Sequence, residues 1–188
     1  MINIIGGRYK KTKLLVPKKE VRPTSSLKRE AIFSILESYA IKNSYNLYKN
    51  KCFIDLFAGS GALGLEAISR GAEFCFFYEK NIDVLEILDA NCKKICNNAN
   101  YQIINKDLNN TNLFNTKIPI SGIFIDPPYE MTKFDYLLNK IKDLSDLHPH
   151  TFIIIESNKK NKLDNLKGYH IYKEKIFGIT KISLLRLN

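Results

Sequence analysis

Residues 52–64 read CFIDLFAGSGALG. The apolar run 52–57 predicts a buried strand, and the glycines after it predict a sharp turn that opens a helix to about Arg70. Strands and helices continue to alternate on both sides. We expect further strands at 74–78, 101–105, 122–125, 151–155, 169–177 and 179–187, with helices at 25–41, 82–96 and 134–144.

This alternation is typical of a parallel sheet with helices on both faces. The last two strands are joined at Gly178, and so short a connection requires them to be antiparallel. We therefore expect an α/β fold: a Rossmann-like, doubly wound, mostly parallel seven-stranded sheet with a C-terminal antiparallel edge hairpin.

The glycines of the quoted stretch, Gly59, Gly61 and Gly64, form a literal G-x-G-x-x-G between a predicted strand and a predicted helix. A side chain there would stop the backbone from turning sharply and approaching a ligand closely. Glu79 follows Gly59 by 20 residues, at the end of the next predicted strand, where a carboxylate can accept hydrogen bonds from both ribose hydroxyls. The pattern predicts a site for an adenosine-type cofactor.

Two adenosine-type cofactors would fit this pattern, and Asp55 distinguishes between them. A nicotinamide dinucleotide would place a charged pyrophosphate at the helix start, where a neighbouring carboxylate repels it. S-adenosylmethionine has no phosphate and carries an ammonium and a sulfonium cation, which a carboxylate attracts. We therefore predict S-adenosylmethionine.

A second motif, Asp126-Pro127-Pro128-Tyr129, follows the predicted strand 122–125. In a doubly wound sheet this strand lies beside the strand 52–57, at the point where strand order reverses and ligands bind. The motif should therefore face Asp55 and the glycine turn across one cleft. A turn that merely ends a strand is the competing structural interpretation.

The motif suits methyl transfer to a planar amine, whose lone pair is delocalised into the ring. Asp126 and the Pro127 carbonyl can accept the hydrogens of such an amine and hold its nitrogen in line with the methyl group. The two prolines fix an extended loop, and Tyr129 can stack on the base. Carbon methylation of a pyrimidine would need a cysteine here, and the motif has none.

The net charge of +10 is concentrated near the N-terminus. Residues 1–30 hold nine basic and two acidic side chains, whereas residues 31–188 hold 20 basic and 17 acidic ones. A uniform bias toward lysine would not give this distribution, so we predict a polyanion-binding element there, with a membrane surface as the weaker alternative. We expect residues 1–24 to form a basic, hairpin-like extension apart from the core and residues 25–188 to form the catalytic domain, with Arg29 facing outward.

The remaining features of the sequence argue against a membrane protein, a secreted protein and a metal-binding protein. The length fits one main globular unit, no apolar run approaches the roughly 20 residues that span a bilayer, and residues 1–11 do not resemble a secretion signal. The cysteines fit a reducing, cytoplasmic setting; Cys92 and Cys96 are four apart but have no suitable partners, so we predict no metal site. We expect His148, His150 and His170 to be surface or loop residues. For Glu156, orienting the substrate and capping a strand remain equal alternatives.

Together these residues resemble the RsmD family, class I methyltransferases that modify the exocyclic N2 of a guanine in 16S ribosomal RNA. The resemblance runs nearly end to end. Its motifs are Ile4-Ile5-Gly6-Gly7, Arg22-Pro23-Thr24, Arg29-Glu30-Ala31-Ile32-Phe33, Asp55 to Gly64 with Leu65-Glu66-Ala67, Ser69-Arg70-Gly71-Ala72, Asp126 to Tyr129, and Glu156.

The resemblance implies roles for individual residues. Gly59, Gly61 and the neighbouring main chain would hold the methionine part of the cofactor, Glu79 the ribose, and Asp107 the adenine amino group, while Asp126, Pro127 and Tyr129 would hold the guanine. The full set that we expect at the cofactor is Asp55, Phe57, Ala58, Gly59, Ser60, Gly61, Gly64, Glu79, Lys80, Asp107 and Leu108. The catalytic set is Asp126, Pro127, Pro128 and Tyr129. The RNA-binding set is Arg8, Lys10, Lys11, Lys13, Arg22, Thr24 and Arg29.

The sequence departs from the family at two places. Ser26 and Leu27 stand where the family usually has an acid and then an arginine, and Tyr129 stands where many members have phenylalanine. The implied substrate is 16S ribosomal RNA, within the small ribosomal subunit or its precursor, and the implied state is a monomer. The alternatives are an amino methyltransferase acting on adenine N6 in DNA or on a protein glutamine, and a non-catalytic RNA-binding assembly factor.

Overall fold

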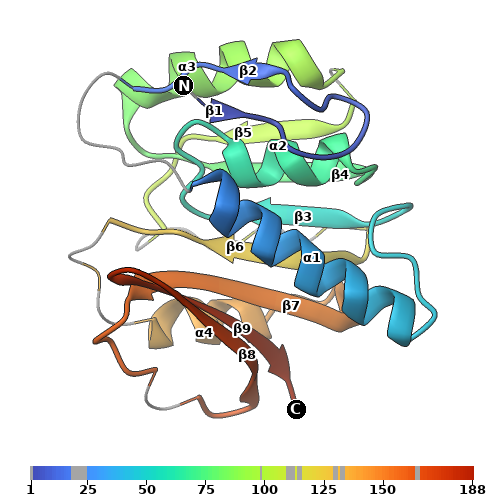
Figure 1. Ribbon diagram of the computed structural model, residues 1–188, viewed down its shortest axis with the longest axis vertical. Helices are drawn as coiled ribbons and strands as arrows, with labels where there is room; N and C mark the ends of the chain where they lie inside the picture. The colour runs from blue at the N-terminus through green and yellow to red at the C-terminus, as the bar shows by residue number, and fades with distance from the viewer. Residues whose placement is uncertain are drawn as a thin grey trace.

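A computed structural model describes residues 2–17, 25–97, 99–108, 113, 116–128, 131, 134–163 and 166–188. Its main feature is a seven-stranded sheet in the order β5-β4-β3-β6-β7-β9-β8 (Figure 1). The strands are β3 (Cys52–Asp55), β4 (Phe74–Tyr78), β5 (Tyr101–Ile104), β6 (Ile120–Ile125), β7 (Leu147–Asn158), β8 (Tyr169–Phe177) and β9 (Thr180–Leu187).

The first five strands in this order are parallel, and β9 pairs antiparallel with both β7 and β8. The predicted mostly parallel sheet with an antiparallel edge hairpin is therefore confirmed. One strand is longer than expected, because β7 begins at Leu147. Leu147 pairs with Ile120, and the register then shifts before Phe152 pairs with Gly122. This irregularity lets the strand include Pro149, whose nitrogen cannot donate a ladder hydrogen bond.

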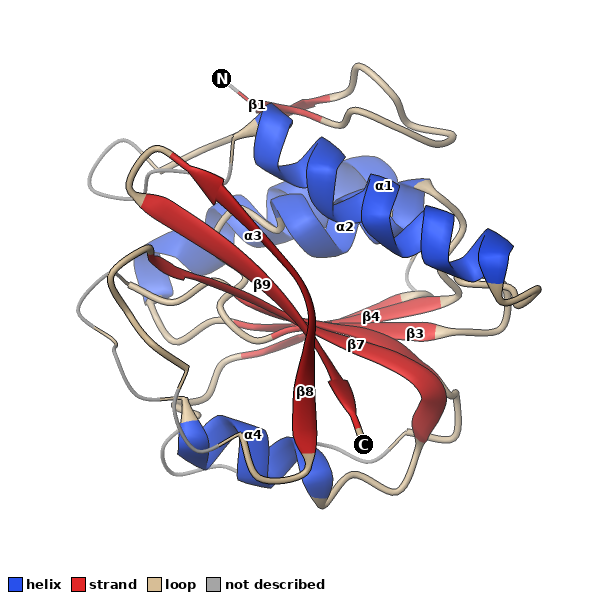
Figure 2. Ribbon diagram, turned by 60° about the horizontal axis from the view of Figure 1, so that its bottom comes forward, coloured by secondary structure: helices blue, strands red, loops and turns tan. Residues whose placement is uncertain are grey.

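In the described part of the chain, four helices cover the sheet: α1 (Ser26–Lys42), α2 (Ala62–Ser69), α3 (Ile82–Ile95) and α4 (Asp135–Lys142). Figure 2 shows α1, α2 and α3 on one face and α4 on the other. The three-helix core, between the sheet and the first three helices, includes Phe33, Phe53, Leu88, Phe124 and Ile154. The α4 core, on the other face, includes Ile123, Leu137, Ile141 and Ile155.

The N-terminal segment forms a small antiparallel sheet, in which β1 (Ile2–Asn3) pairs with β2 (Lys13–Leu14). The expectation that this segment stands apart from the core is wrong. Ile2, Ile4 and Leu14 are buried and belong to the three-helix core. These three side chains are therefore the buried side of a hairpin packed onto the domain.

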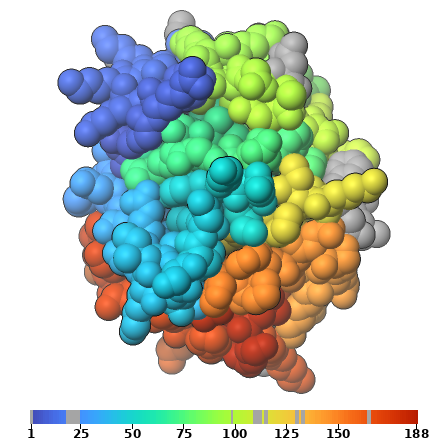
Figure 3. All heavy atoms as spheres, turned by 90° about the vertical axis from the view of Figure 1, so that its right-hand side faces the viewer, coloured from blue at the N-terminus to red at the C-terminus, as the bar shows by residue number. Residues whose placement is uncertain are grey.

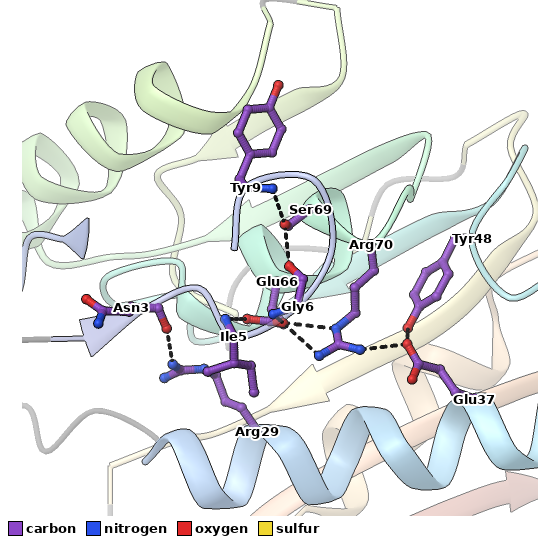
Figure 4. Close-up of polar contacts among 10 residues, drawn as sticks. All are labelled: Asn3, Ile5, Gly6, Tyr9, Arg29, Glu37, Tyr48, Glu66, Ser69 and Arg70. Carbon is purple, nitrogen blue, oxygen red and sulfur yellow. Dashed lines mark hydrogen bonds and ion pairs between the residues drawn. The ribbon is translucent and has the colours of Figure 1, made fainter. Parts of the chain in front are cut away.

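Polar contacts to α2 fasten this hairpin (Figure 4). The fully buried Glu66 accepts hydrogen bonds from the Ile5 and Gly6 amides at 2.9 and 2.7 Å. Ser69 lies one turn further along, and its carbonyl accepts from the Arg8 amide at 2.7 Å. Gly7 has φ 74°, and a Cβ there would lie 1.9 Å from the Ser69 carbonyl oxygen. Gly7 is thus required for close contact between the hairpin and α2.

Candidate active site

The loops that carry the two predicted motifs open side by side. Asp55, the last residue of β3, pairs with Phe124 of the parallel strand β6, and the Leu56 amide donates to the Phe124 carbonyl at 3.0 Å. Strands β4 and β5 end at the same edge, because they are parallel to β3. The predicted adjacency of the glycine turn and the Asp126 loop is therefore confirmed.

The glycine turn has the tight geometry that the spacing predicted. Gly59 and Gly61 have φ 52° and 80°, and Gly61 occupies the position before the first residue of α2. The third glycine serves packing, since a Cβ at Gly64 would lie 2.3 Å from the Phe77 ring. The backbone thus starts α2 directly above the sheet, with the turn at the shared edge.

Glu79 contacts the turn directly. One carboxylate oxygen accepts from the Gly59 amide at 2.9 Å and the other from the Asn81 amide at 2.8 Å. The side chain is half-buried. Each carboxylate oxygen has a second lone pair, so the group can also accept from a pair of ligand hydroxyls. Glu79 therefore links the glycine turn to the end of β4, where a ribose was predicted to lie.

Asp55 is a buried acid of the site whose pKa is raised. Its side chain is buried; Oδ2 accepts from the Gly64 amide at 3.1 Å, and Oδ1 has no hydrogen-bond partner among the described residues. Burial raises the pKa of Asp55 to about 7, and the charges of Asp126 and Glu79 add to the rise, while the Gly64 and Phe57 amides oppose it. Such an acceptor fits a cofactor that presents a cation, and it would repel a pyrophosphate.

Asp126 and Pro127 follow the end of β6 and are half-buried, whereas Pro128 is exposed. Because Asp126 perturbs the pKa of Asp55, the two carboxylates are close enough to interact. Side chains alternate between faces along a strand. Phe124 lies in the three-helix core and Ile125 in the α4 core, so Asp126 comes on the same face as α1 and α2. Tyr129 lies outside the described residues.

The remaining cofactor candidates lie after β5, after β4 and within the glycine turn. The Glu79 amide donates to the Ile104 carbonyl at 3.2 Å, which brings the end of β5 beside Glu79. Lys80 and Asp107 form an exposed ion pair at 3.8 Å, and Leu108 is buried. Phe57 is half-buried, while Ala58 and Ser60 are buried within the turn. The predicted cofactor residues thus gather at one edge of the sheet.

Sequence reasoning missed Asn91 of α3, which is fully buried. Its amide nitrogen donates to the Ser60 carbonyl and to the Leu15 carbonyl, both at 2.9 Å, and its Oδ1 accepts from the Leu15 amide at 2.8 Å. One side chain therefore joins the cofactor turn to the N-terminal segment. The available signal was its place on the apolar stripe of α3, with Leu88 and Ile95.

The predicted RNA-binding residues separate into three groups. Arg8, Lys10, Lys11 and Lys13 are exposed on the hairpin, which Figure 3 shows in dark blue, standing out at one corner of the surface beside α3. Arg22 and Thr24 lie outside the described residues. Arg29 does not face outward as expected: it is fully buried, and its Nη2 donates to the Asn3 carbonyl at 2.6 Å. It fastens β1 to α1, and burial lowers its pKa.

No metal-binding or catalytic role was predicted for the cysteines and the histidines. Cys52, Cys75 and Cys92 are buried, Cys96 is half-buried, and all four are free. In the described part of the chain no group of three or more acidic, histidine or cysteine side chains could hold a metal ion, and no helix is long and apolar enough to cross a membrane. His148 and His150 stack on Tyr45 near the start of β7, at the edge opposite the glycine turn.

Comparison with known proteins agrees with this geometry. A family model described as "Conserved hypothetical protein 95" matches residues 2–186. The chain is 35% identical over 178 residues to Ribosomal RNA small subunit methyltransferase D of Buchnera aphidicola subsp. Acyrthosiphon pisum, which covers 93% of this chain and 87% of that protein. It is 29% identical to the putative rRNA methyltransferase YlbH of Bacillus subtilis, covering 98% of each.

A solved structure described as the putative methyltransferase yhhF from Escherichia coli matches with a TM-score of 0.80 at 29% identity. The match covers 100% of this chain and 98% of that one, so it includes the N-terminal hairpin and the edge hairpin β8–β9 as well as the parallel strands. The glycine turn, the adjacent Asp126 loop and these end-to-end similarities lead to one conclusion: the chain belongs to the RsmD family of methyltransferases.

Proposed function

We propose that this protein transfers a methyl group from S-adenosylmethionine to the exocyclic N2 of a guanine in small-subunit ribosomal RNA. The observation that carries the proposal is the pairing of two loops at one sheet edge. One bears a glycine turn and the buried Asp55, and the other bears Asp126 and Pro127. The relatives named as ribosomal RNA methyltransferases support the choice of RNA.

The residues present fit the cofactor. The unpartnered Oδ1 of Asp55 provides an acceptor for a cation, and Glu79 provides acceptors for ribose hydroxyls. Lys80, Asp107 and Leu108 border the position where the adenine would lie. When bound, S-adenosylmethionine supplies an electrophilic methyl group: the nitrogen–carbon bond forms as the carbon–sulfur bond breaks, and its electron pair stays on sulfur.

The substrate amine needs activation that the chain's own groups can provide. Asp126 and the Pro127 carbonyl would accept the two amine hydrogens, which holds the nitrogen in line with the methyl carbon and favours its pyramidal form. Once the nitrogen is methylated and cationic, its proton leaves readily to solvent. A separate general base is therefore unnecessary. Tyr129 would stack on the base.

Binding of RNA is assigned to the hairpin and to the basic residues that follow it. Arg8, Lys10, Lys11 and Lys13 are exposed on a segment tied by Asn91 to the cofactor turn, so phosphates bound there would lie on the same rigid unit as the active site. Arg22 and Thr24 belong to the same proposal. The protein would act in the cytoplasm as a monomer, on the small ribosomal subunit or its precursor.

The test is methyl transfer with labelled cofactor. Small subunits and free ribosomal RNA from cells lacking the protein would be offered beside duplex DNA and a release factor. We expect label in the ribosomal substrates, and mass mapping of that RNA should locate one N2-methylguanine that depends on the protein. Label in duplex DNA or in the release factor alone would contradict the proposal. Cofactor binding without transfer to any of these substrates would favour a non-catalytic assembly factor.

A further inference from the structure

Glu156 is a second carboxylate beside the Asp126 loop. It lies near the end of β7 and is 7% exposed. Its Oε1 pairs with the ammonium of Lys28 in the first turns of α1, and Lys28 is 6% exposed. Its other oxygen, Oε2, is buried and has no hydrogen-bond partner among the described residues. One oxygen of this carboxylate therefore has a partner inside the protein, and the other has none among the described residues.

The register places this group next to Asp126. Ile125 of β6 pairs with Ile155 of β7, so the next residue in each chain segment, Asp126 or Glu156, stands at the same level, with the two backbones about 5 Å apart across the sheet. Ile154 and Phe124 both lie in the three-helix core, so Glu156 and Asp126 come on the same face of the sheet. The two carboxylates therefore border one space at the carboxyl edge.

A buried carboxylate oxygen without a partner is costly, and such a group in a native protein calls for an explanation. The ion pair with Lys28 explains Oε1 and leaves Oε2 without a role. A cap of the strand end would engage backbone amides, and the described residues offer none to this oxygen. The alternative is a hydrogen-bond donor supplied by the substrate.

We propose that Glu156 Oε2 accepts the N1–H of the target guanine and that Lys28 is the residue that positions it. This inference rests on the proposed function. In guanine the N1–H lies next to the exocyclic amine, so an amine held by Asp126 would bring N1 toward the neighbouring strand, where Glu156 lies. Enzymes that extract a base from its stack read it by hydrogen bonds to this edge.

The consequence is selection among amine substrates. Adenine has an unprotonated N1 next to its amine, and this lone pair would face the Glu156 oxygen without a proton between them. A site built to accept a hydrogen bond rejects an analogue that lacks the donor far more strongly than an apolar pocket rejects one by size. Glu156 would thus make this four-residue motif specific for guanine over adenine.

The experiment compares guanine with 2-aminopurine at the methylated position, once that position has been located. 2-Aminopurine keeps the reacting amine, but its N1 carries a lone pair in place of the N–H. Each base would be ligated into small-subunit RNA, and kcat/KM would be measured for the native protein and for Glu156→Gln. Because glutamine leaves the Lys28 ammonium without its partner, the double variant Lys28→Met with Glu156→Gln serves as the charge-matched form.

We expect the native protein to prefer guanine by at least about a hundredfold. In both variants the ratio should fall to below about tenfold, because the glutamine amide can either accept from N1–H or donate to the N1 lone pair. The ratio is the informative quantity, since 2-aminopurine also lacks the 6-oxygen and a folding defect would slow both substrates equally.

An unchanged ratio in both variants, with both substrates slowed alike, would overturn the inference and leave Glu156 a structural residue. Absence of a preference in the native protein would overturn it too. Failure of the native protein to methylate guanine in any ribosomal RNA would instead overturn the proposed function, and it would be visible before any variant is made.

Discussion

Asp126 is the side chain on which methyl transfer should depend most. If its oxygen accepts a hydrogen of the amine as proposed, Asp126→Ala should lower the rate by on the order of a hundredfold or more and leave cofactor affinity nearly intact. Asp126→Asn should lose less, since an amide oxygen still accepts one hydrogen. Single-turnover rates and calorimetric binding of the cofactor would be compared for both.

The matched control is Asp143→Ala, which removes an exposed acid just after α4, on the opposite face of the sheet from α1 and α2. This variant should retain the native rate. An equal loss of cofactor binding and rate in Asp126→Ala would contradict the assigned role, because it would mean that the residue supports the cofactor site and not the amine.

Asp55 should make cofactor binding depend on pH. Its pKa is raised to about 7, first by burial. The ionised form attracts the cations of S-adenosylmethionine, so affinity should rise as pH increases from 6 to 8, and Asp55→Asn should remove most of this dependence. Calorimetry at several pH values would measure it, with S-adenosylhomocysteine, which lacks the sulfonium charge, as the comparison. A rise of the same size in Asp55→Asn would assign the titration to another group.

The same shift gives the cofactor-free protein an opposite trend in stability. The folded-state pKa of Asp55 lies above its ordinary value of 3.8, so the folded protein binds the proton more tightly than the unfolded chain does. The contribution to stability is therefore fully present below about pH 4 and is lost as pH rises toward 7. The charged form of Asp55, which should favour cofactor binding, therefore lowers the free energy of unfolding of the cofactor-free protein.

At the scale of elements, the contact between the N-terminal hairpin and α2 depends on Gly7. Gly7→Ala should destabilise the protein by roughly 1–3 kcal/mol or more, because it combines a φ of 74° with a Cβ 1.9 Å from the Ser69 carbonyl oxygen. Gly178→Ala is a matched control: its φ is 62° and nothing lies within 4 Å of the added Cβ, so it should cost about 1–2 kcal/mol. Urea unfolding would give both values.

Equal costs for the two variants would mean that the hairpin moves away from α2 without loss. The prediction can be checked further by proteolysis, because a hairpin detached in Gly7→Ala should be cut between residues 8 and 13, while the sheet domain remains intact. Rapid cleavage there in the native protein would contradict the packing described for this segment.

Elements with a strong periodic pattern were predictable from the sequence, and the hairpin's packing was not. The strands β3 to β7 are short apolar runs between turns, and their order follows from general rules of parallel sheets. The hairpin is held by side chains far away in sequence: Glu66, 60 and 61 residues from the amides it binds, and Asn91, 76 residues from Leu15. Local patterns carry no sign of such partners.

The same lack of a local signal explains why Arg29 was predicted wrongly and why the role of Glu156 was left open. Arg29 lies next to polar residues in the sequence, so it was expected to face solvent, but β1 packs over that side of α1 and buries it. Glu156 was left between two roles, because its ion pair with Lys28 joins residues 128 positions apart. The positions of Asp55, Glu79 and Asp126 were predictable, since each lies at or directly after the end of a strand, at the same edge of the sheet.

For the whole molecule, the arrangement joins the two proposed functions, cofactor binding and RNA binding, on one face. The helices α2 and α3 begin at the cofactor edge, and both also hold the N-terminal hairpin, through Glu66 and Ser69 of α2 and Asn91 of α3. The basic segment is therefore fixed relative to the proposed methyl donor site, and it is not a loosely tethered arm. RNA phosphates bound by the hairpin would constrain where the target base can lie.

The charge of this hairpin should determine how RNA binding responds to salt. Reversing Lys10, Lys11 and Lys13 to glutamate should weaken binding more at 50 mM than at 300 mM salt, because each phosphate contact releases counterions. The slope of log affinity against log salt should become shallower by about 2, for the roughly 0.7 ions released per contact on single-stranded RNA. The same reversal at Lys42, Lys49 and Lys94, which are exposed elsewhere in the chain, should change the slope little. Fluorescence anisotropy across this salt range would measure both sets; a defect of equal size at every salt concentration would mean that the hairpin lysines act through folding and not through phosphate contact.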